Sequence, residues 1–287
     1  MKYRTLTNGN HAVAGVIEAL LLVALVAIII STIQLVYIPQ IMEQREADHM
    51  DEVANQFSFL KSVIDLQSMM KEDVPISSTL TLGSRELPYF VTAPASGELY
   101  AYDQEYVDEW NINVDNGAGL FPLTSVRYRA NNRYFPKGQP GQEYILEGGA
   151  IILKQQDGEN MLVSPAITID NTTNPIDIYY EIPILIGIPG KNATSGYKNC
   201  FIRTNYSHSH ANWQTDLENA GNITIHTEYP TAWYDLFNAS LTDNVDIEYH
   251  LGPSYVTVKQ IMPGGRLINF YYKETYIYVQ ISPGWIE

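Results

Sequence analysis

The chain has 287 residues, a formal net charge of −15 and 21 tyrosines, and 17% of its residues are charged. A nucleic-acid-binding protein needs a basic surface, and this acidic sequence has no basic cluster after its first residues, which argues against nucleic acid as a partner. The single cysteine, Cys200, excludes an internal disulfide framework and a cysteine-based zinc cluster.

An apolar segment dominates the N-terminal part of the chain. Between Ala12 and Ile38 the one charged residue is Glu18, and Ala19–Ile30 contains no polar side chain. A helix over this span is about 40 Å long, enough to cross a hydrocarbon core of about 30 Å. We therefore predict a transmembrane helix over residues 12–38.

The charges on either side of this segment predict its orientation. Lys2 and Arg4 precede it, within a polar leader over residues 1–11, whereas mostly acidic residues follow it. The positive-inside rule then places the leader in the cytoplasm and the chain after Tyr37 outside the cell. The expected location is the cell membrane, crossed once, with membrane lipid as a partner. An extracellular filament is the alternative location.

Glu18 is the unusual residue of the apolar segment. A carboxylate inside a bilayer costs roughly 2.5–3.5 kcal/mol on insertion scales, so it is expected to have a partner. Two interpretations are open. Glu18 lies near the cytoplasmic interface, where its carboxylate reaches water, or it pairs with a positive group on a neighbouring chain.

Two stretches of the sequence resemble archaeal type IV pilin-like membrane proteins. The first is Ala12-Val13-Ala14-Gly15-Val16-Ile17-Glu18 with the apolar run that follows it to Tyr37. The second is Tyr128-Arg129-Ala130-Asn131-Asn132-Arg133-Tyr134 followed by Glu147-Gly148-Gly149-Ala150-Ile151-Ile152, similar to a hairpin of that family. The resemblance extends to about residue 165 and contains no catalytic motif.

The resemblance implies a hydrophobic helix, an acidic helical stalk and a β domain. In type IV pilins a short basic leader is removed, and a glutamate at the fifth mature position pairs with the freed N-terminal amine of an adjacent subunit. Cleavage before Ala14 would give Glu18 that position, whereas cleavage before His11 or Ala12 would not. The leader here lacks the basic pair and the small residue that precede the apolar stretch in the family. The resemblance thus makes Glu18 an assembly residue and like subunits the partners.

An amphipathic pattern follows the apolar segment. Apolar residues recur at helical spacing, at Val53, Phe57, Leu60 and Ile64. We predict an extracellular helix within residues 39–74 that ends near Lys71, with a kink or interruption at Pro39. The apolar stripe faces either the β domain of its own chain or a neighbouring subunit.

Residues 75–287 carry strand signals joined by Gly, Pro and Asn turns. The predicted fold class is α+β, a long N-terminal hydrophobic and amphipathic helix followed by an antiparallel β-sandwich-like domain. Asp157-Gly158 predicts a hairpin. Short helices are expected over 216–220 and 232–241, and residues 170–175 are an alternative domain boundary. The predicted strands are 78–82, 150–154, 161–163, 176–188 with an interruption at Pro183, 201–205, 223–227, 245–250, 255–259, 267–272 and 276–281.

N-glycosylation sequons gather in the second half of the chain. Asn-x-Ser/Thr without proline occurs at Asn171, Asn192, Asn205, Asn222 and Asn238. We interpret these as glycan sites on an outward-facing surface.

Residues that could carry chemistry are few, and no catalytic or cofactor site is predicted. His208 and His210 could chelate a metal on a strand, but a solvated loop is the favoured interpretation. The acidic run Asp103, Glu105, Asp108 and Glu109 lacks the spacing of a calcium loop and is interpreted as surface charge. Cys200 is expected to be a buried small residue, with an intermolecular bridge as the alternative.

Three functions remain open. The first is a pilin-like structural or adhesive surface protein, and it is not an enzyme. The second is a non-assembling, single-pass surface protein that binds a glycan or another surface protein through its tyrosine-rich face. The third is a membrane-tethered hydrolase with a dispersed site.

Overall fold

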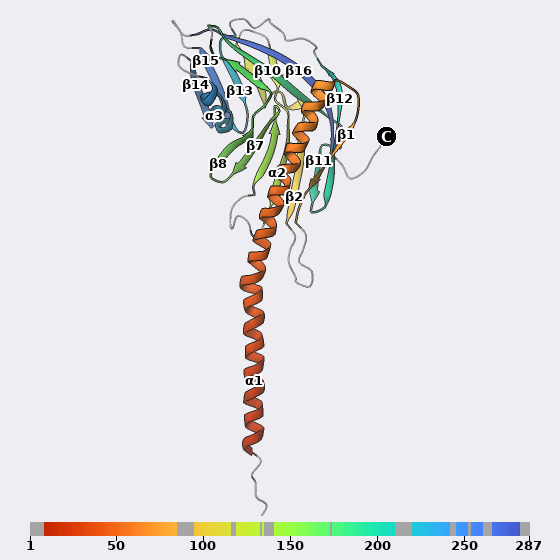
Figure 1. The fold of residues 1–287 in the computed structure, drawn as a ribbon, viewed down its shortest axis with the longest axis vertical. Coiled ribbons are helices and arrows are strands. Elements are labelled where there is room, and N and C mark those ends of the chain that lie inside the picture. The colour runs from red at the N-terminus through yellow and green to blue at the C-terminus, as the bar shows by residue number, and fades with distance from the viewer. Residues whose placement is uncertain are drawn as a thin grey trace, which may run out of the picture.

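The computed structural model has a long helical rod that projects from a β domain (Figure 1). Helix α1 (Gly9–Thr32), a π-helical turn η1 (Ile33–Tyr37) and helix α2 (Ile38–Met70) follow one another without a break. This confirms the predicted α+β fold class. The residues that the structure describes are 9–84, 95–115, 119–132, 134, 141–172, 174–209, 220–241, 245–251, 254–260 and 266–281.

Pro39 does not interrupt the helix. Proline has no N–H to donate, so the backbone bond pattern must change around it. The N–H of Ile38 donates to the carbonyl of Ile33, five residues earlier, and both Tyr37 and Ile38 keep right-handed helical dihedrals. A π-helical turn thus accommodates the proline. Above it α2 leans away from the line of α1 (Figure 1), so the predicted kink is present and the predicted interruption is wrong.

Three sheets form the β domain, with two short helical segments, η2 (Gln104–Tyr106) and α3 (Pro230–Ser240). Sheet A contains, in spatial order, β1 (Ile76–Thr81), β12 (Asn199–Ser209), β16 (Ile268–Ile281), β10 (Ile176–Gly187) and β9 (Ile167–Asp170). Sheet B contains β11 (Ala193–Gly196), β2 (Ser96–Tyr102), β5 (Ser125–Asn131), β6 (Glu143–Glu147), β7 (Ala150–Gln155) and β8 (Gly158–Val163). Sheet C contains β14 (Val245–Leu251), β15 (Ser254–Gln260), β13 (Ile223–His226), β3 (Asn111–Val114) and β4 (Gly119–Pro122).

Sheet A departs from the predicted antiparallel order. Strands β10 and β16 pair in parallel along the whole of β10. The two strands predicted over 267–272 and 276–281 are one strand, β16. Strand β10 also runs through Pro183, because β9 pairs only with the segment before it, so no strand needs the missing N–H of the proline. The Thr124 hydroxyl lies at this edge, where it donates to the Pro183 carbonyl and accepts the N–H of Leu185.

Residues 170–175 connect β9 to β10, which are antiparallel neighbours in sheet A. One hydrophobic core contains buried residues from both sides of this connection, among them Ile152 and Ile223. The alternative boundary there is therefore not a boundary between separate cores.

Helix α2 covers one of the two hydrophobic cores. Its predicted stripe of Val53, Phe57, Leu60 and Ile64 is almost fully buried. These side chains pack with residues of sheets A and B, so the stripe faces the helix's own β domain. The predicted helix end is also confirmed, since α2 ends at Met70 and Lys71 adopts the left-handed cap conformation.

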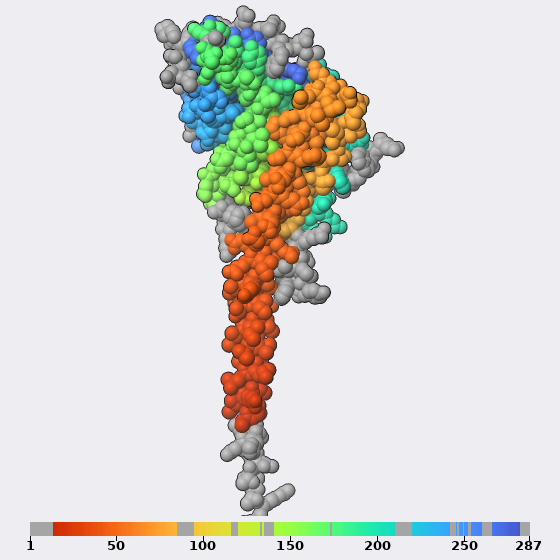
Figure 2. Space-filling model, viewed as in Figure 1, coloured from red at the N-terminus to blue at the C-terminus, as the bar shows by residue number. Residues whose placement is uncertain are grey.

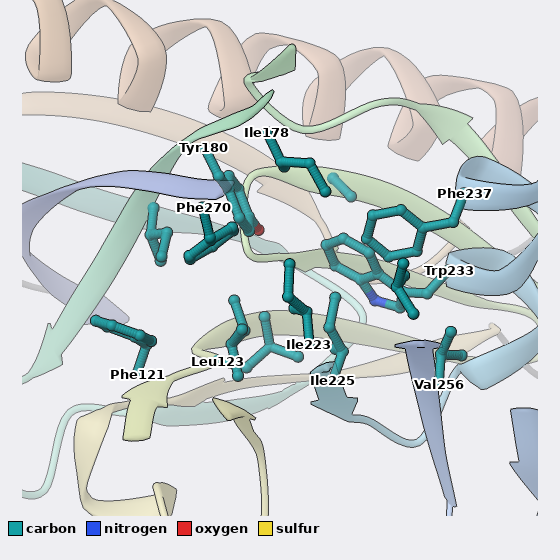
Figure 3. Close-up of a cluster of buried hydrophobic side chains, with 14 of the residues drawn as sticks. Phe121, Leu123, Ile178, Tyr180, Ile223, Ile225, Trp233, Phe237, Val256 and Phe270 are labelled. Atoms are coloured by element: carbon teal, nitrogen blue, oxygen red, sulfur yellow. The ribbon is translucent and has the colours of Figure 1, made fainter. Parts of the chain in front are cut away.

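The second core lies between sheets A, B and C and α3 (Figure 3). Trp233 and Phe237 of α3 are buried there against Tyr180 of β10 and Val256 of β15. The helix predicted over 232–241 is confirmed as α3. Residues 216–219 of the other predicted short helix lie outside the described residues, and Ala220 is buried without helical structure.

The docking of α2 predicts unequal costs for two neighbouring phenylalanines. We expect Phe57→Ala to lower the free energy of unfolding by about 3–5 kcal/mol, because it empties a fully buried site beside Tyr144. Phe59→Ala, at an exposed site on the same helix, should change it by about 0.5 kcal/mol or less. Urea unfolding of the detergent-solubilised chain measures both, and equal effects would contradict this packing.

Candidate functional site

Helix α1 is apolar on every side and its own chain leaves it uncovered. From Val16 to Ile30 its large apolar side chains are 45–66% exposed, and Figure 2 shows the rod standing clear of the domain. Its 24 residues span about 36 Å, long enough to cross a bilayer. A surface of this kind needs lipid or another protein to cover it.

Glu18 is an exposed carboxylate within this apolar surface. Its neighbours one turn away on the same face are Ala14, Leu21 and Leu22. None of the ion pairs among the described residues includes Glu18. The side chain therefore faces whatever covers α1, and the structure leaves both interpretations of its partner open.

Polar side chains of α2 fix the helix against β1, the edge strand of sheet A. The Thr81 N–H donates to Gln56 Oε1 at 2.9 Å, and Gln56 Nε2 donates to Thr81 Oγ1 at 3.0 Å. His49 Nε2 lies 2.8 Å from the Thr81 carbonyl and must donate, since a carbonyl oxygen only accepts. Further along, Gln67 Nε2 donates to the Thr204 carbonyl at 3.1 Å. These bonds fix how far α2 is shifted along sheet A and how it is rotated about its own axis. Because α1 continues from α2, they also fix the direction of α1.

The sequon asparagines are dispersed over the β domain. Asn171 follows β9, Asn192 precedes β11, Asn205 lies in β12, Asn222 precedes β13 and Asn238 lies in α3. Among these five, only Asn238 is exposed, and the other four are half-buried.

Three of these asparagines already use the amide nitrogen to which a glycan would be attached. Asn171 Nδ2 donates to the carbonyl of Ser240 at 3.0 Å, Asn205 Nδ2 to Asp73 Oδ1 at 2.6 Å, and Asn222 Nδ2 to Asp115 Oδ2 at 2.7 Å. The sequence pattern alone gave no sign of these bonds. The geometry therefore favours Asn238 as the best-presented sequon.

The other residues that could carry chemistry do not form a site among the described residues. Cys200 is buried, and burial raises the pKa of its thiol to about 12, which confirms the expected buried small residue. His208 lies on strand β12, so the loop interpretation is wrong for it, and its ring stacks on Tyr276 with ring centroids 4.4 Å apart. His210 lies outside the described residues. Within the described parts of the chain, no group of three His, Cys, Asp or Glu side chains could hold a metal.

The acidic run has a local structural role. Asp103 Oδ1 accepts the N–H of Glu105 at 3.1 Å and so caps η2. Glu105, Asp108 and Glu109 are exposed. Their exposure agrees with the interpretation of this run as surface charge.

A buried charge centre joins sheet B to sheet C, and sequence reasoning missed it. Glu147 is fully buried at the end of β6. Its Oε1 accepts from Thr227 Oγ1 at 2.6 Å and from Trp233 Nε1 at 3.0 Å, and its Oε2 lies 3.7 Å from Arg127 Nη2. Thr227 and Trp233 flank the start of α3, so one carboxylate ties that segment to sheet B.

Aromatic rings enclose the arginine of this centre. The Arg127 guanidinium lies 4.5 Å from the ring centroid of Tyr102, 4.4 Å from that of Trp110 and 5.2 Å from that of Tyr229. Its Nη1 also donates to Glu228. Because the charge is paired and stacked rather than open to a ligand, the centre is structural.

Glu147 lies in the segment 147–152, the hairpin that resembles one in the pilin-like proteins. Gly148 and Gly149 both have positive φ, 54° and 82°, and connect β6 to β7 with Glu147 paired to Ala150. The Tyr180 hydroxyl donates to the Gly148 carbonyl at 2.7 Å. The one feature of the sequence that could have drawn attention to Glu147 was its place directly before a Gly-Gly turn.

The comparisons with known proteins give no match: no family model, curated protein or solved structure matches this chain.

Burial raises the pKa of the Glu147 carboxyl above its ordinary value of 4.5, although Arg127 opposes the shift. The folded chain then binds more protons than the unfolded chain above pH 4.5, so this group's contribution to stability falls as pH rises through that window. Glu147→Gln keeps the acceptor for Thr227 and Trp233 but cannot titrate. We expect the stability of the wild type relative to this variant to decline from pH 4.5 upward, measured by urea unfolding. Parallel pH curves would contradict it.

Proposed function

We propose that this chain is a pilin-like structural protein of the cell surface. It is anchored by its N-terminal helix or assembled into a filament through that helix, with a glycosylated β-rich domain outside. The observation that carries the proposal is the contrast along one continuous helix. Helix α2 is buried on its own domain, whereas α1 presents apolar side chains in all directions. Lipid covers such a surface in a single anchored chain, and the helices of other copies cover it in a filament.

Charge supports the proposed orientation. Lys2 and Arg4 lie before the apolar segment, and Glu43 and Asp48 are among the acidic residues that follow it. The positive-inside rule places the β domain outside the cell. An acidic exterior keeps such a domain soluble at the surface.

Glu18 is the proposed assembly residue. Removal of the leader before Ala14 would free an amine four residues from Glu18. In an apolar environment the carboxylate of one copy and the amine of the next each need the other, because an unpaired charge there is costly. Pairing between copies would set their stagger along the helix.

One observation favours the second candidate, a non-assembling surface protein that binds glycans or another surface protein. On sheet A, Tyr179 and Tyr271 stack with ring centroids 4.6 Å apart. Asn269 Nδ2 donates to Asp177 Oδ1 at 2.8 Å beside them. Aromatic rings flanked by amide and carboxylate groups suit a saccharide, because ring faces contact C–H surfaces and polar edges bind hydroxyls. Binding of the purified chain to immobilised glycans would support this candidate.

The proposed role of Glu18 predicts a loss of assembly. Glu18→Ala should lower the assembled fraction at least about tenfold, because it leaves the neighbouring amine unpaired in apolar surroundings. Sedimentation of material shed from the cell surface measures that fraction. Asp51→Ala removes an exposed carboxylate from α2 and is the matched control, expected to assemble normally.

Protein sequencing of the mature N-terminus separates the outcomes. A new terminus between Gly9 and Ala14 is expected from pilin-type processing, and one at Ala14 from the fifth-position role of Glu18. An intact Met1 would contradict pilin-type processing. Normal assembly of Glu18→Ala would contradict the role of Glu18 alone. Turnover of ester, peptide or glycoside substrates by the purified chain would instead favour the hydrolase.

Glycan occupancy should follow the presentation of each asparagine. We expect Asn238→Gln to remove one glycan from the intact mass of the chain, because Asn238 is exposed on α3. Asn222→Gln should remove less mass on average, since its amide is bonded to Asp115. Intact mass spectrometry of the protein from its native host is the measurement, and an unchanged mass for Asn238→Gln would contradict the assignment.

A further inference from the structure

A polar groove lies beside the half of α2 that is nearer to α1. One wall consists of polar residues of α2, namely Arg45, Asp48, His49 and Glu52. The other wall includes Ser84, which follows β1, and Tyr197 and Lys198, which precede β12. The cavity has a volume of about 870 Å³, within the range of about 300–1,000 Å³ that small-molecule sites occupy. We call it the α2 groove.

Two buried polar atoms at the α2 groove have no hydrogen-bond partner among the described residues. They are Ser84 Oγ and His49 Nδ1, in residues that are 7% and 5% exposed and that both line the groove. His49 Nε2 donates to the Thr81 carbonyl, so the neutral ring keeps Nδ1 as an acceptor. A buried polar atom without a partner destabilises the fold. A ligand that brings hydroxyl groups into the groove can bond to both atoms, because a hydroxyl donates and accepts.

The charges of the α2 groove favour a neutral ligand. Arg45 and Lys198 are basic and Asp48 and Glu52 are acidic, so the four formal charges cancel. An anion would meet the two carboxylates, and a cation would meet the two basic groups. A metal ion is disfavoured as well, because no group of three His, Cys, Asp or Glu side chains in the described part of the chain could hold one.

Tyr197 gives the groove an aromatic surface. The residue is 52% exposed, and Lys198 Nζ lies 6.0 Å from the centroid of its ring. The face of an aromatic ring packs on the C–H surface of a sugar ring, while the sugar hydroxyls bond to polar groups beside it. Among neutral ligands, a saccharide therefore matches both the aromatic and the hydrogen-bonding groups of the groove.

We propose that the α2 groove binds a saccharide of about two or three rings. A cavity of about 150 Å³ holds one benzene ring, so about 870 Å³ leaves room for several sugar rings with their hydroxyls. Tyr197 packs on one sugar ring, and sugar hydroxyls bond to Ser84 Oγ, to His49 Nδ1 and to the Asp48 carboxylate. The inference goes beyond the proposed structural role, and it needs no contact between copies of the chain.

The position of the groove gives two sources for the saccharide. Arg45 and Glu52 lie 7 and 14 residues beyond Ile38, which is about 10 and 20 Å along α2. If α1 spans a membrane, the headgroup layer extends about 5–8 Å beyond the hydrocarbon core, so the groove lies just above it. The saccharide is then either the headgroup of a glycolipid in the same membrane or part of a free glycan at the cell surface.

A binding measurement on the full chain tests the site. The chain is reconstituted in phosphatidylcholine vesicles and titrated with fluorescent di- and trisaccharides of glucose, mannose, galactose and N-acetylglucosamine. We expect saturable binding of at least one of these probes. The same titration in vesicles that also contain a digalactosyl lipid separates the sources. An apparent affinity at least about threefold lower there indicates a glycolipid headgroup, and an unchanged affinity indicates a free glycan.

Variants test whether the saccharide lies in the groove. Tyr197→Ala should weaken binding at least about fivefold, because it removes the ring face. Ser84→Ala should weaken binding at least about threefold without lowering the free energy of unfolding, because it deletes a hydroxyl that has no partner among the described residues. Tyr278→Ala is the matched control and should bind normally. Tyr278 is 43% exposed and pairs with Asn205, about 20 Å along β12 from Asn199, where that strand begins.

Three results would overturn the proposal. The first is the absence of binding by every probe in both kinds of vesicle. The second is binding by Tyr197→Ala and Ser84→Ala that is as tight as that of Tyr278→Ala. The third is loss of binding in Tyr179→Ala alone, which would assign the saccharide to sheet A. Filaments without saccharide binding would overturn this inference and leave the proposed function standing, whereas saccharide binding by chains that never assemble would do the reverse.

Discussion

The burial of one face of α2 is the interaction on which the rest of the structure depends. Val53, Phe57, Leu60 and Ile64 fill the space between sheets A and B, and each buried side chain of this size contributes roughly 1.5–3 kcal/mol. Hydrogen bonds from Gln56 and His49 to Thr81 fix the helix in height and rotation. Because α1 continues from α2, the same contacts orient an apolar rod that the domain itself does not cover.

The far side of the β domain depends on a different interaction. Glu147 binds Thr227 and Trp233 while its charge faces Arg127, and this ties α3 and sheet C to sheet B. A buried carboxylate and guanidinium are expensive to desolvate, so the pair is more useful for fixing one arrangement of the sheets than for stability. Sheet C is thus held by the apolar packing of the second core together with the charge and hydrogen bonds of Glu147.

Features with a local pattern were predictable from the sequence, and features that join distant segments were not. The stripe of α2 and Trp233 with Phe237 in α3 follow helical periodicity, and the structure confirms both. The parallel pairing of β10 with β16 joins residues 92 positions apart and leaves no local pattern. Arginine and glutamate usually lie at protein surfaces, so the sequence does not predict that Arg127 and Glu147 are buried. Only the tertiary packing buries them. Asn171 likewise matches a sequon, although its amide is bonded in the fold.

The central proposal is that other copies of the chain cover α1 in a filament. Electron microscopy of material shed from the cell surface tests it most directly. The account predicts filaments with the apolar helices in their core and the β domains outside. Preparations that contain only single chains, with every copy retained in membrane vesicles and no filaments at any expression level, would contradict it.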